Sequence, residues 1–210
     1  MHPAYFPDIV SFAVMMRAGE VVWDIHAHFD KQTYRNRMYI HAAHGKQMLS
    51  VPVRHAKGME RRAFKDVEVS GESDWQRYHW KSLETAYRTS PYFEFYEDDL
   101  KPFFEKKFRL LLDVNKAALE KILELADIDL SLTFTERYDP SPADIADFRF
   151  LVDAKKRPVN TEALPSYTQV FSDRNGFIPG LSILDLLFME GPKAMLYLKN
   201  LDIDKLLEKR

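Results

Sequence analysis

Apolar residues recur at helical spacing near the start of the chain, between residues 9 and 16. They follow Pro7-Asp8, a typical helix entry, and Gly19 comes shortly after the last of them. The pattern predicts a helix that ends at Gly19. The apolar run that follows predicts a buried strand over residues 20–25.

Later stretches predict further strands. Residues 37–41 and 48–53 flank the turn-forming pair His44-Gly45, so we expect two strands around this turn. Shorter strands are expected at three other places, over residues 66–69, 132–135 and 169–171.

The middle of the chain is predicted to be helical. Ser73 and Gln76 fit a capping box, and this helix is expected to run to residue 89, before Ser90-Pro91 stops it. Further helices are expected over residues 108–126, which carry the clearest amphipathic stripe, and near the end over 182–189 and 192–198.

A strand–helix–strand order at the start, with helices later, favours an α/β fold. We expect a Rossmann-like sheet core with flanking helices and a helical middle segment. The 210 residues are long enough to bury one core, and we expect a single domain over residues 1–210. Residues 138–142 and 155–158 are interpreted as loops within it.

The composition excludes several classes of protein. The chain has no Cys, which excludes disulfide frameworks, thiolate metal sites and cysteine nucleophiles. It has no apolar run of about 20 residues and no signal-peptide pattern, so we expect a cytoplasmic protein without membrane insertion. The glycine-rich phosphate-binding motifs are also absent.

The charge distribution points to an anionic small molecule. Residues 1–62 hold nine Lys and Arg against five Asp and Glu, while the rest of the chain carries an excess of acids; the net charge is −2. All seven histidines lie within the first 79 residues. Basic and imidazole groups in one segment suit a phosphate-bearing ligand, whereas the chain as a whole is not basic enough to indicate a nucleic-acid binder. A solvated surface of mixed charge is the alternative.

The first candidate site follows the predicted strand at residues 20–25. If that strand continues, Asp24, His26 and His28 point to one face. A carboxylate could then orient a histidine base, or the three groups could hold a divalent metal. Exposed polar residues at a strand end are the structural alternative.

The second candidate site is the segment Lys31-Gln32-Thr33-Tyr34-Arg35-Asn36-Arg37. Guanidinium groups supply planar donor forks for phosphate or carboxylate, and the lysine supplies a point charge. We expect Lys31, Tyr34, Arg35, Asn36 and Arg37 to bind substrate, although a solvated basic loop would have the same sequence.

Four polar residues interrupt apolar patterns elsewhere. His79 and Asn115 lie on predicted helices, where we expect them to be satisfied core residues. Asp185 lies in an otherwise apolar helix, so it is either paired or functional. Gln169, in the stretch before that helix, joins Asp185 as a candidate for substrate binding.

Taken in order, these segments resemble the WbqC-like protein family. The matching stretches cover nearly the whole chain and include residues 3–7 (PAYFP), 31–37 (KQTYRNR), 49–53 (LSVPV), 90–93 (SPYF), Tyr167-x-Gln169, Phe177-x-Pro179 and 181–188 (LSILDLLF). Glu190-Gly191 stands where the family usually has Asn-Gly, and Gly180 stands where Asn is common.

The resemblance implies a role in glycan biosynthesis. Members of the family are known mainly from bacterial O-antigen (lipopolysaccharide) and other surface-polysaccharide gene clusters, and a glycine-transferase role has been proposed for some. It supplies no established catalytic residues and no cofactor.

We therefore expect a transferase that acylates an amino sugar or nucleotide sugar. His26 or His28 would be the base with Asp24 as its orienter, the 31–37 segment would bind the phosphates, and Gln169 and Asp185 would close the other side. An ATP-using enzyme and a non-enzymatic binding module are the alternatives. Convergence of the predicted binding residues in one pocket would favour an enzyme.

Overall fold

The computed structural model describes residues 1–54, 62–154 and 157–207. Its helices, in chain order, are α1 (Ile9–Ala18), α2 (Trp75–Tyr87), α3 (Phe93–Glu105), α4 (Leu111–Ala126), α5 (Ser172–Asn175), α6 (Ile183–Glu190), α7 (Ala194–Lys199) and α8 (Ile203–Leu207). Short 3-10 turns are η1 (Phe64–Asp66), η2 (Arg149–Val152), η3 (Thr161–Ala163) and η4 (Gly191–Lys193).

The strands form two small sheets. β1 (Glu20–Trp23) pairs in parallel with β4 (Ser131–Phe134), and β2 (Arg37–Ala42) pairs antiparallel with β3 (Gly45–Ser50). The mixture of helix and strand agrees with the predicted α/β class. In the described part of the chain no larger sheet joins the two pairs, so a Rossmann-like core is not confirmed.

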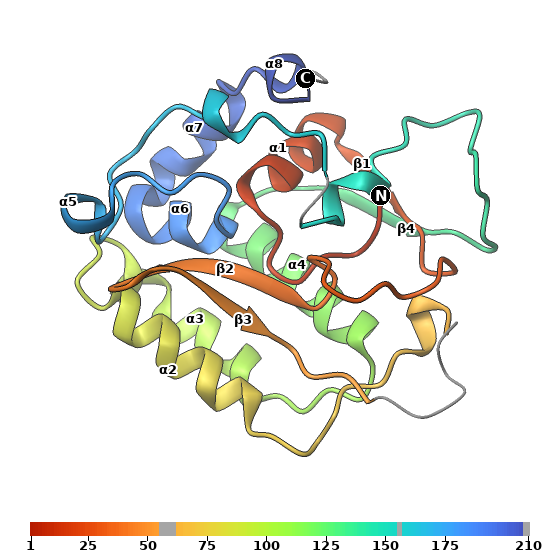
Figure 1. Ribbon diagram of the computed structural model, residues 1–210, viewed down its shortest axis with the longest axis horizontal. Coiled ribbons are helices and arrows are strands. Elements are labelled where there is room, and N and C mark those ends of the chain that lie inside the picture. The colour runs from red at the N-terminus through yellow and green to blue at the C-terminus, as the bar shows by residue number, and fades with distance from the viewer. Residues whose placement is uncertain (55–61, 155–156, 208–210) are drawn as a thin grey trace.

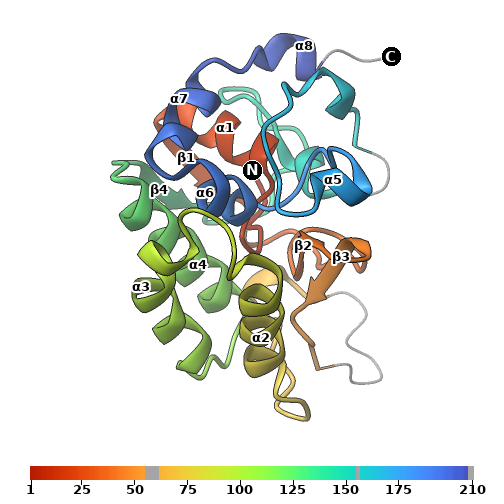
Figure 2. The same ribbon diagram turned by 90° about the vertical axis from the view of Figure 1, so that its left-hand side faces the viewer.

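The β2–β3 hairpin lies between two groups of helices. Figures 1 and 2 show α2, α3 and α4 on one side of it, and α1, α6 and α7 on the other. One cluster of buried apolar side chains includes members from both groups, from Tyr5 near the start to Leu206 in α8. The hairpin is thus sandwiched, with one face toward each group.

Local chemistry explains why several elements form as predicted. The Asp8 carboxylate accepts hydrogen bonds from the main-chain N–H groups of Val10 and Ser11, which caps α1, and Gly19 ends that helix at φ +70°. Gly45 makes the hairpin turn at φ +97°. Ser182 caps α6 by accepting from the N–H of Leu184.

Other predicted boundaries are wrong. β1 ends at Trp23 rather than residue 25, because the Asp24 carboxylate accepts the N–H groups of His26 and Ala27 and turns the chain. The predicted capping box fails, because Asp74 stands at the N-cap of α2 and makes no side-chain hydrogen bond there. The stretch at residues 169–171 is irregular, because the Ser172 hydroxyl and N–H both bond back to the Gln169 carbonyl.

Other predicted elements also differ from the observed ones. The second hairpin strand runs over Gly45–Ser50 instead of 48–53, and the stretch at 66–69 begins as the 3-10 turn η1 with isolated bridges instead of a strand. Sequence patterns did not predict α3 at all. Of the predicted 155–158 loop, residues 155 and 156 lie outside the described residues.

No helix among the described residues is long and apolar enough to cross a membrane.

Candidate functional site

Strand β2 presents two different faces. Met38 and Ile40 are fully buried on the core side, as the period-2 alternation of a strand requires. Arg37, Tyr39 and His41 alternate with them and therefore lie on the other face, toward the group of helices that contains α6. This polar face runs along the seam between the two helix groups.

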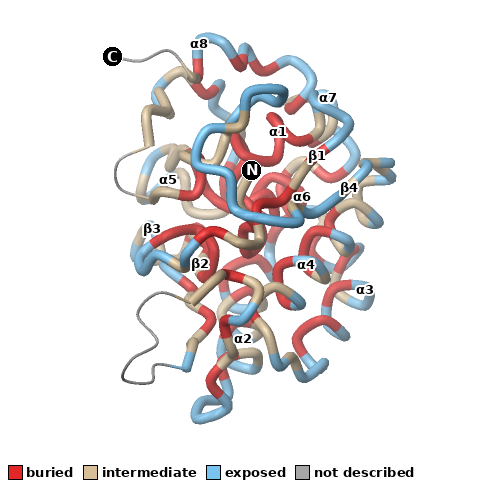
Figure 3. The backbone as a smooth tube through the Cα atoms, turned by 90° about the vertical axis from the view of Figure 1, so that its right-hand side faces the viewer, coloured by how far each residue is buried: buried red, intermediate tan, exposed pale blue. Residues whose placement is uncertain are grey.

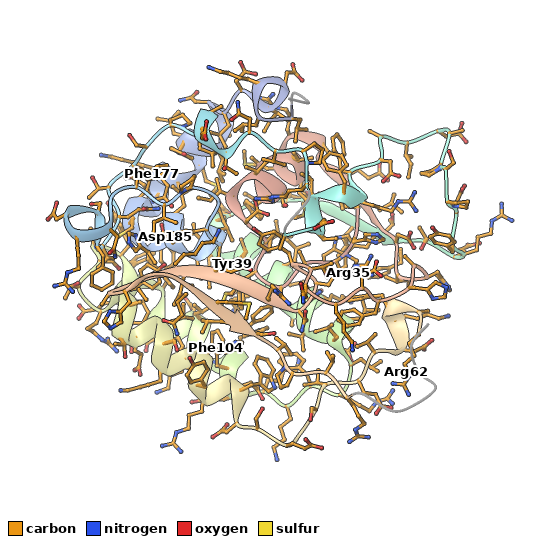
Figure 4. The ribbon with its side chains drawn as sticks, viewed as in Figure 1. Arg35, Tyr39, Arg62, Phe104, Phe177 and Asp185 are labelled. Carbon is orange, nitrogen blue, oxygen red and sulfur yellow. The ribbon has the colours of Figure 1, made fainter. Side chains whose placement is uncertain are left out.

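Two phenol rings and two cations gather at this face, and we call them the cation–aromatic cluster: Tyr34, Tyr39, Lys46 and Arg157. The Arg157 guanidinium carbon lies 4.9 Å from the centre of the Tyr34 ring, and the Lys46 ammonium lies 4.4 Å from that of Tyr39. The two rings meet edge to face at 5.7 Å. Figure 4 places Tyr39 on β2 in the seam, between Arg35 and Asp185 in that view.

A single buried carboxylate anchors this cluster. Arg157 Nη1 lies 2.7 Å from Asp8 Oδ2, and the exposed fractions of the two side chains are only 7% and 1%. The same carboxylate caps α1, so one residue fixes both the helix entry and the guanidinium. Removal of two charges from water is costly, and the pair is tolerated because Asp8 also accepts from two N–H groups and the Ser11 hydroxyl.

The charges in and beside the cluster favour an anion. Burial and the Arg157 charge lower the pKa of Lys46, while Asp8 opposes that change. Burial, followed by the Asp8 charge, raises the pKa of Tyr34, and the Arg37 charge acts in the opposite direction. Among the described residues, the charges of Arg157 and Arg37 act on these groups together with the Asp8 carboxylate, and Lys46 adds a third cation. Lys46 is exposed and Tyr39 half-buried, so the cluster can be reached from solvent.

A second polar network lies farther along the same seam, around Asp185. This carboxylate is fully buried and accepts hydrogen bonds from Tyr87 Oη at 2.6 Å and from Gln169 Nε2 at 3.2 Å, and also from the Tyr167 hydroxyl. Tyr87 Oη in turn accepts the main-chain N–H of His41. The network therefore ties α2, α6 and the 165–180 segment to the polar face of β2.

Burial raises the pKa of Asp185 to about 6, although hydrogen bonds from Tyr167, Tyr87 and Gln169 oppose the rise. A raised folded-state pKa gives stability that is complete below the unfolded pKa, near 4, and is lost as pH rises through about 6. Stability should therefore fall by about 2–3 kcal/mol between pH 4 and 7 through this group.

Chemical denaturation at several pH values tests this expectation. Asp185→Asn should remove the fall between pH 4 and 7, whereas Asp173→Asn, which changes an exposed carboxylate on α5, should keep it. Parallel pH profiles for the wild type and Asp185→Asn would contradict the account.

The predicted catalytic residues lie at a turn and do not share a strand face. Asp24 pairs with Arg149 at 3.0 Å and accepts main-chain N–H groups, so its described partners do not include either imidazole. His26 is half-buried and His28 is exposed. The described residues also contain no cluster of His, Asp and Glu that could hold a metal ion, so the metal alternative finds no support there.

The predicted binding segment divides into different environments. Lys31 is exposed, whereas Arg35 is 2% exposed and donates from Nη1 to the His28 carbonyl at 2.6 Å. Asn36 donates to the Val51 carbonyl at 2.9 Å, while its own side-chain oxygen is buried with no partner among the described residues. Of the predicted binding segment, Tyr34 belongs to the cation–aromatic cluster and Arg37 acts on it by charge.

The expected core residues have structural partners. His79 Nδ1 lies 2.9 Å from the Tyr5 hydroxyl, and burial lowers the pKa of His79 to about 4. Asn115 donates to the Arg35 carbonyl at 2.9 Å. Both therefore help to hold the segments that carry the site.

Six residues that the structure brings to the seam were not among the predicted site residues, although Tyr167 lies in the matching stretch Tyr167-x-Gln169: Asp8, His41, Lys46, Tyr87, Arg157 and Tyr167. A signal was present in the alternation of Arg37, Tyr39 and His41 with Met38 and Ile40, which predicts a strand with one polar and one apolar face. The charged groups that act on Tyr34 include Asp8 and Arg157, which are far from it in sequence, and local sequence carries no sign of such contacts.

The comparisons with known proteins decide the family. A model of the WbqC-like protein family matches residues 2–157 and 153–197. The chain belongs to the WbqC-like family. It is also similar to the uncharacterized protein Rv1507c of Mycobacterium tuberculosis, with 27% identity over 198 residues that span 81% of this chain and 84% of the relative. No solved structure matches.

Proposed function

We propose that this WbqC-like protein is a cytoplasmic transferase of bacterial surface-polysaccharide biosynthesis. It transfers an aminoacyl group, in the first instance glycine, to an amino sugar linked to a nucleotide. The occurrence of the family mainly in O-antigen and other surface-polysaccharide gene clusters supports the pathway. The cation–aromatic cluster supports the nucleotide-linked substrate, and it is the observation that carries the proposal.

The cluster suits a sugar nucleotide for two reasons. Lys46 is exposed and could contact a diphosphate directly, while Arg157, held by the buried Asp8, would contribute a fixed positive charge beside it. The half-buried Tyr39 ring lies beside them and offers an apolar edge for a base or sugar. The cations are already close together, and a bound anion would relieve their mutual repulsion.

The proposed reaction forms an amide bond between the amino sugar and the aminoacyl carbonyl while the bond from that carbonyl to its activated donor breaks. His26 or His28 would take the proton that the attacking amine loses. We assign Asp24 a positioning role, because its hydrogen bonds shape the turn that carries both histidines. Gln169 and Asp185 would act from the other end of the seam, through Tyr87 and β2.

A thermal-shift screen tests the proposal. The ligands are UDP- and dTDP-linked amino sugars, ATP and glycine, because a ligand that binds the folded state raises Tm by mass action. We expect a rise with an amino-sugar nucleotide that is reduced in Lys46→Gln and in Arg37→Ala. Lys107→Gln, which changes an exposed lysine just after α3, is the matched control and should respond like the wild type.

The other outcomes separate the alternatives. A rise with ATP alone would favour a nucleotide-dependent enzyme over the transferase. A rise that persists unchanged in Lys46→Gln would move the ligand away from the cation–aromatic cluster. If no ligand raises Tm, the proposal fails and a non-enzymatic binding module of the glycan pathway takes its place.

A further inference from the structure

A cavity of about 230 Å³ lies between the turn end of the β2–β3 hairpin and helix α2. Sites for drug-sized ligands measure about 300–1,000 Å³, so this cavity suits a single small ring. Figures 2 and 3 show α2 on one side of the hairpin and α5 on the other, with exposed segments at the turn between them. The lining residues Tyr78, Lys81 and Thr85 are exposed, so the cavity opens to solvent.

The cavity is separate from the cation–aromatic cluster. Lys46 and Gln47 are consecutive residues of β3, so their side chains leave opposite faces of the strand. Lys46 contacts Tyr39 on the polar face, whereas Gln47 contacts Tyr78 and Ser82 of α2. A ligand in the cavity therefore meets groups that the proposed nucleotide site does not use.

One amide oxygen in the cavity is fixed in place and free to accept. Gln47 Nε2 lies 3.3 Å from Tyr78 Oη and 3.4 Å from Ser82 Oγ, so both of its hydrogens have acceptors. These contacts hold the side chain across the space between β3 and α2. Gln47 Oε1 accepts no hydrogen bond from the described residues, so it is available to an N–H or O–H of a ligand.

The other walls of the cavity are mainly apolar. Ala42, Ala43 and Ala86 have short side chains, which leave room for a small apolar group such as a methyl. Two aromatic rings complete the lining, from the half-buried Phe171 and from Tyr78, which is 58% exposed. The face of an exposed aromatic ring can cover the C–H groups of a saturated ring.

The charges of the walls favour a neutral ligand. Among the described lining residues only Lys81 is charged, and its ammonium lies 3.7 Å from the Glu84 carboxylate. The ligand that matches these walls has an amide N–H for Gln47, a methyl group for the alanines and a hydroxyl-bearing ring for Tyr78. An N-acetylated amino sugar has all three.

We propose that this cavity binds the pyranose ring of an N-acetylated amino sugar. The acetamido N–H would donate to Gln47 Oε1, its methyl group would lie against the alanines, and the ring would cover Tyr78. The ring hydroxyls would lie near Ser82 and Thr85. The inference does not depend on the proposed transferase activity, because the cavity is on the other face of the hairpin and this sugar carries neither a phosphate nor a free amine.

NMR titration of the ¹⁵N-labelled protein with N-acetylglucosamine tests the site. We expect the signals of the Gln47 side-chain amide and of the Ala42 and Ala43 main chain to move with a Kd of about 1 mM, as for other ligands of this size. Glucose, which has a hydroxyl in place of the acetamido group, should bind about tenfold more weakly or worse, because it lacks the methyl group and the amide N–H.

Two variants locate the sugar and separate this proposal from the nucleotide site. Gln47→Leu keeps the size of the side chain but removes the acceptor, so it should weaken binding of N-acetylglucosamine about tenfold while UDP binding is kept. Lys46→Gln, at the neighbouring position on the other face, should bind the sugar like the wild type. No movement of these signals, equal affinity for glucose, or unchanged affinity in Gln47→Leu would each overturn the proposal.

Discussion

Asp8→Ala should destabilise the protein by roughly 3–5 kcal/mol, the range expected when one partner of a buried ion pair is removed. The substitution leaves the Arg157 guanidinium, only 7% exposed, without its carboxylate. It also removes the acceptor for the Val10 and Ser11 N–H groups at the start of α1, which alone is worth about 1 kcal/mol. Urea denaturation monitored by circular dichroism measures the change.

The chain supplies a close control for this experiment. Asp74 also stands at a helix N-cap, but it is exposed and its side chain makes no capping hydrogen bond. Asp74→Ala should therefore change stability by no more than about 0.5 kcal/mol. Equal effects of the two substitutions would show that the buried pair with Arg157 does not hold this part of the seam.

Gly191→Ala should destabilise by about 3 kcal/mol or more, because it combines backbone strain with a steric clash. Gly191 lies at φ +52° and ψ −127°, a conformation that side chains rarely adopt. A Cβ there would lie 2.5 Å from Cδ1 of the Tyr92 ring. The glycine thus permits the turn from α6 into η4 and the close approach of Tyr92.

Two other glycines separate the two causes. Gly19 has φ +70° but open space where a Cβ would go, so Gly19→Ala should cost only the strain of about 1–2 kcal/mol. Gly71 has neither a positive φ nor a close neighbour, and Gly71→Ala should be nearly neutral. A Gly191→Ala protein as stable as Gly19→Ala would mean that Tyr92 moves aside freely.

Local sequence was sufficient to predict an element's boundary where a single residue fixes the backbone conformation there. Asp8 and Gly19 bound α1 as predicted, and Gly45 makes the predicted hairpin turn. It failed where a side chain competes for main-chain bonds, as Asp24 does when it ends β1 early. The buried residues of α3 recur at helical spacing. In the sequence, however, the neighbouring aromatic residues and Pro102 obscure this amphipathic pattern, so the helix was not predicted.

Long-range contacts limited the prediction of the site. The sequence indicated Tyr34 and Arg37 as binding residues, yet the groups that build the cluster with them come from residues 8, 46 and 157. It also indicated Asp185 and Gln169, which do bond to each other, but did not indicate Tyr87 as a further partner of Asp185. Pairs so distant in sequence leave no local pattern, because their spacing is set only by folding.

The central claim is that the cation–aromatic cluster binds the diphosphate of a nucleotide. Calorimetric titration with UDP tests it most directly, on the wild type, Lys46→Gln and Lys107→Gln. We predict that Lys46→Gln weakens binding about tenfold, equivalent to about 1.4 kcal/mol, while Lys107→Gln binds like the wild type. Equal affinity in all three proteins, or no binding of UDP by the wild type, would contradict the claim.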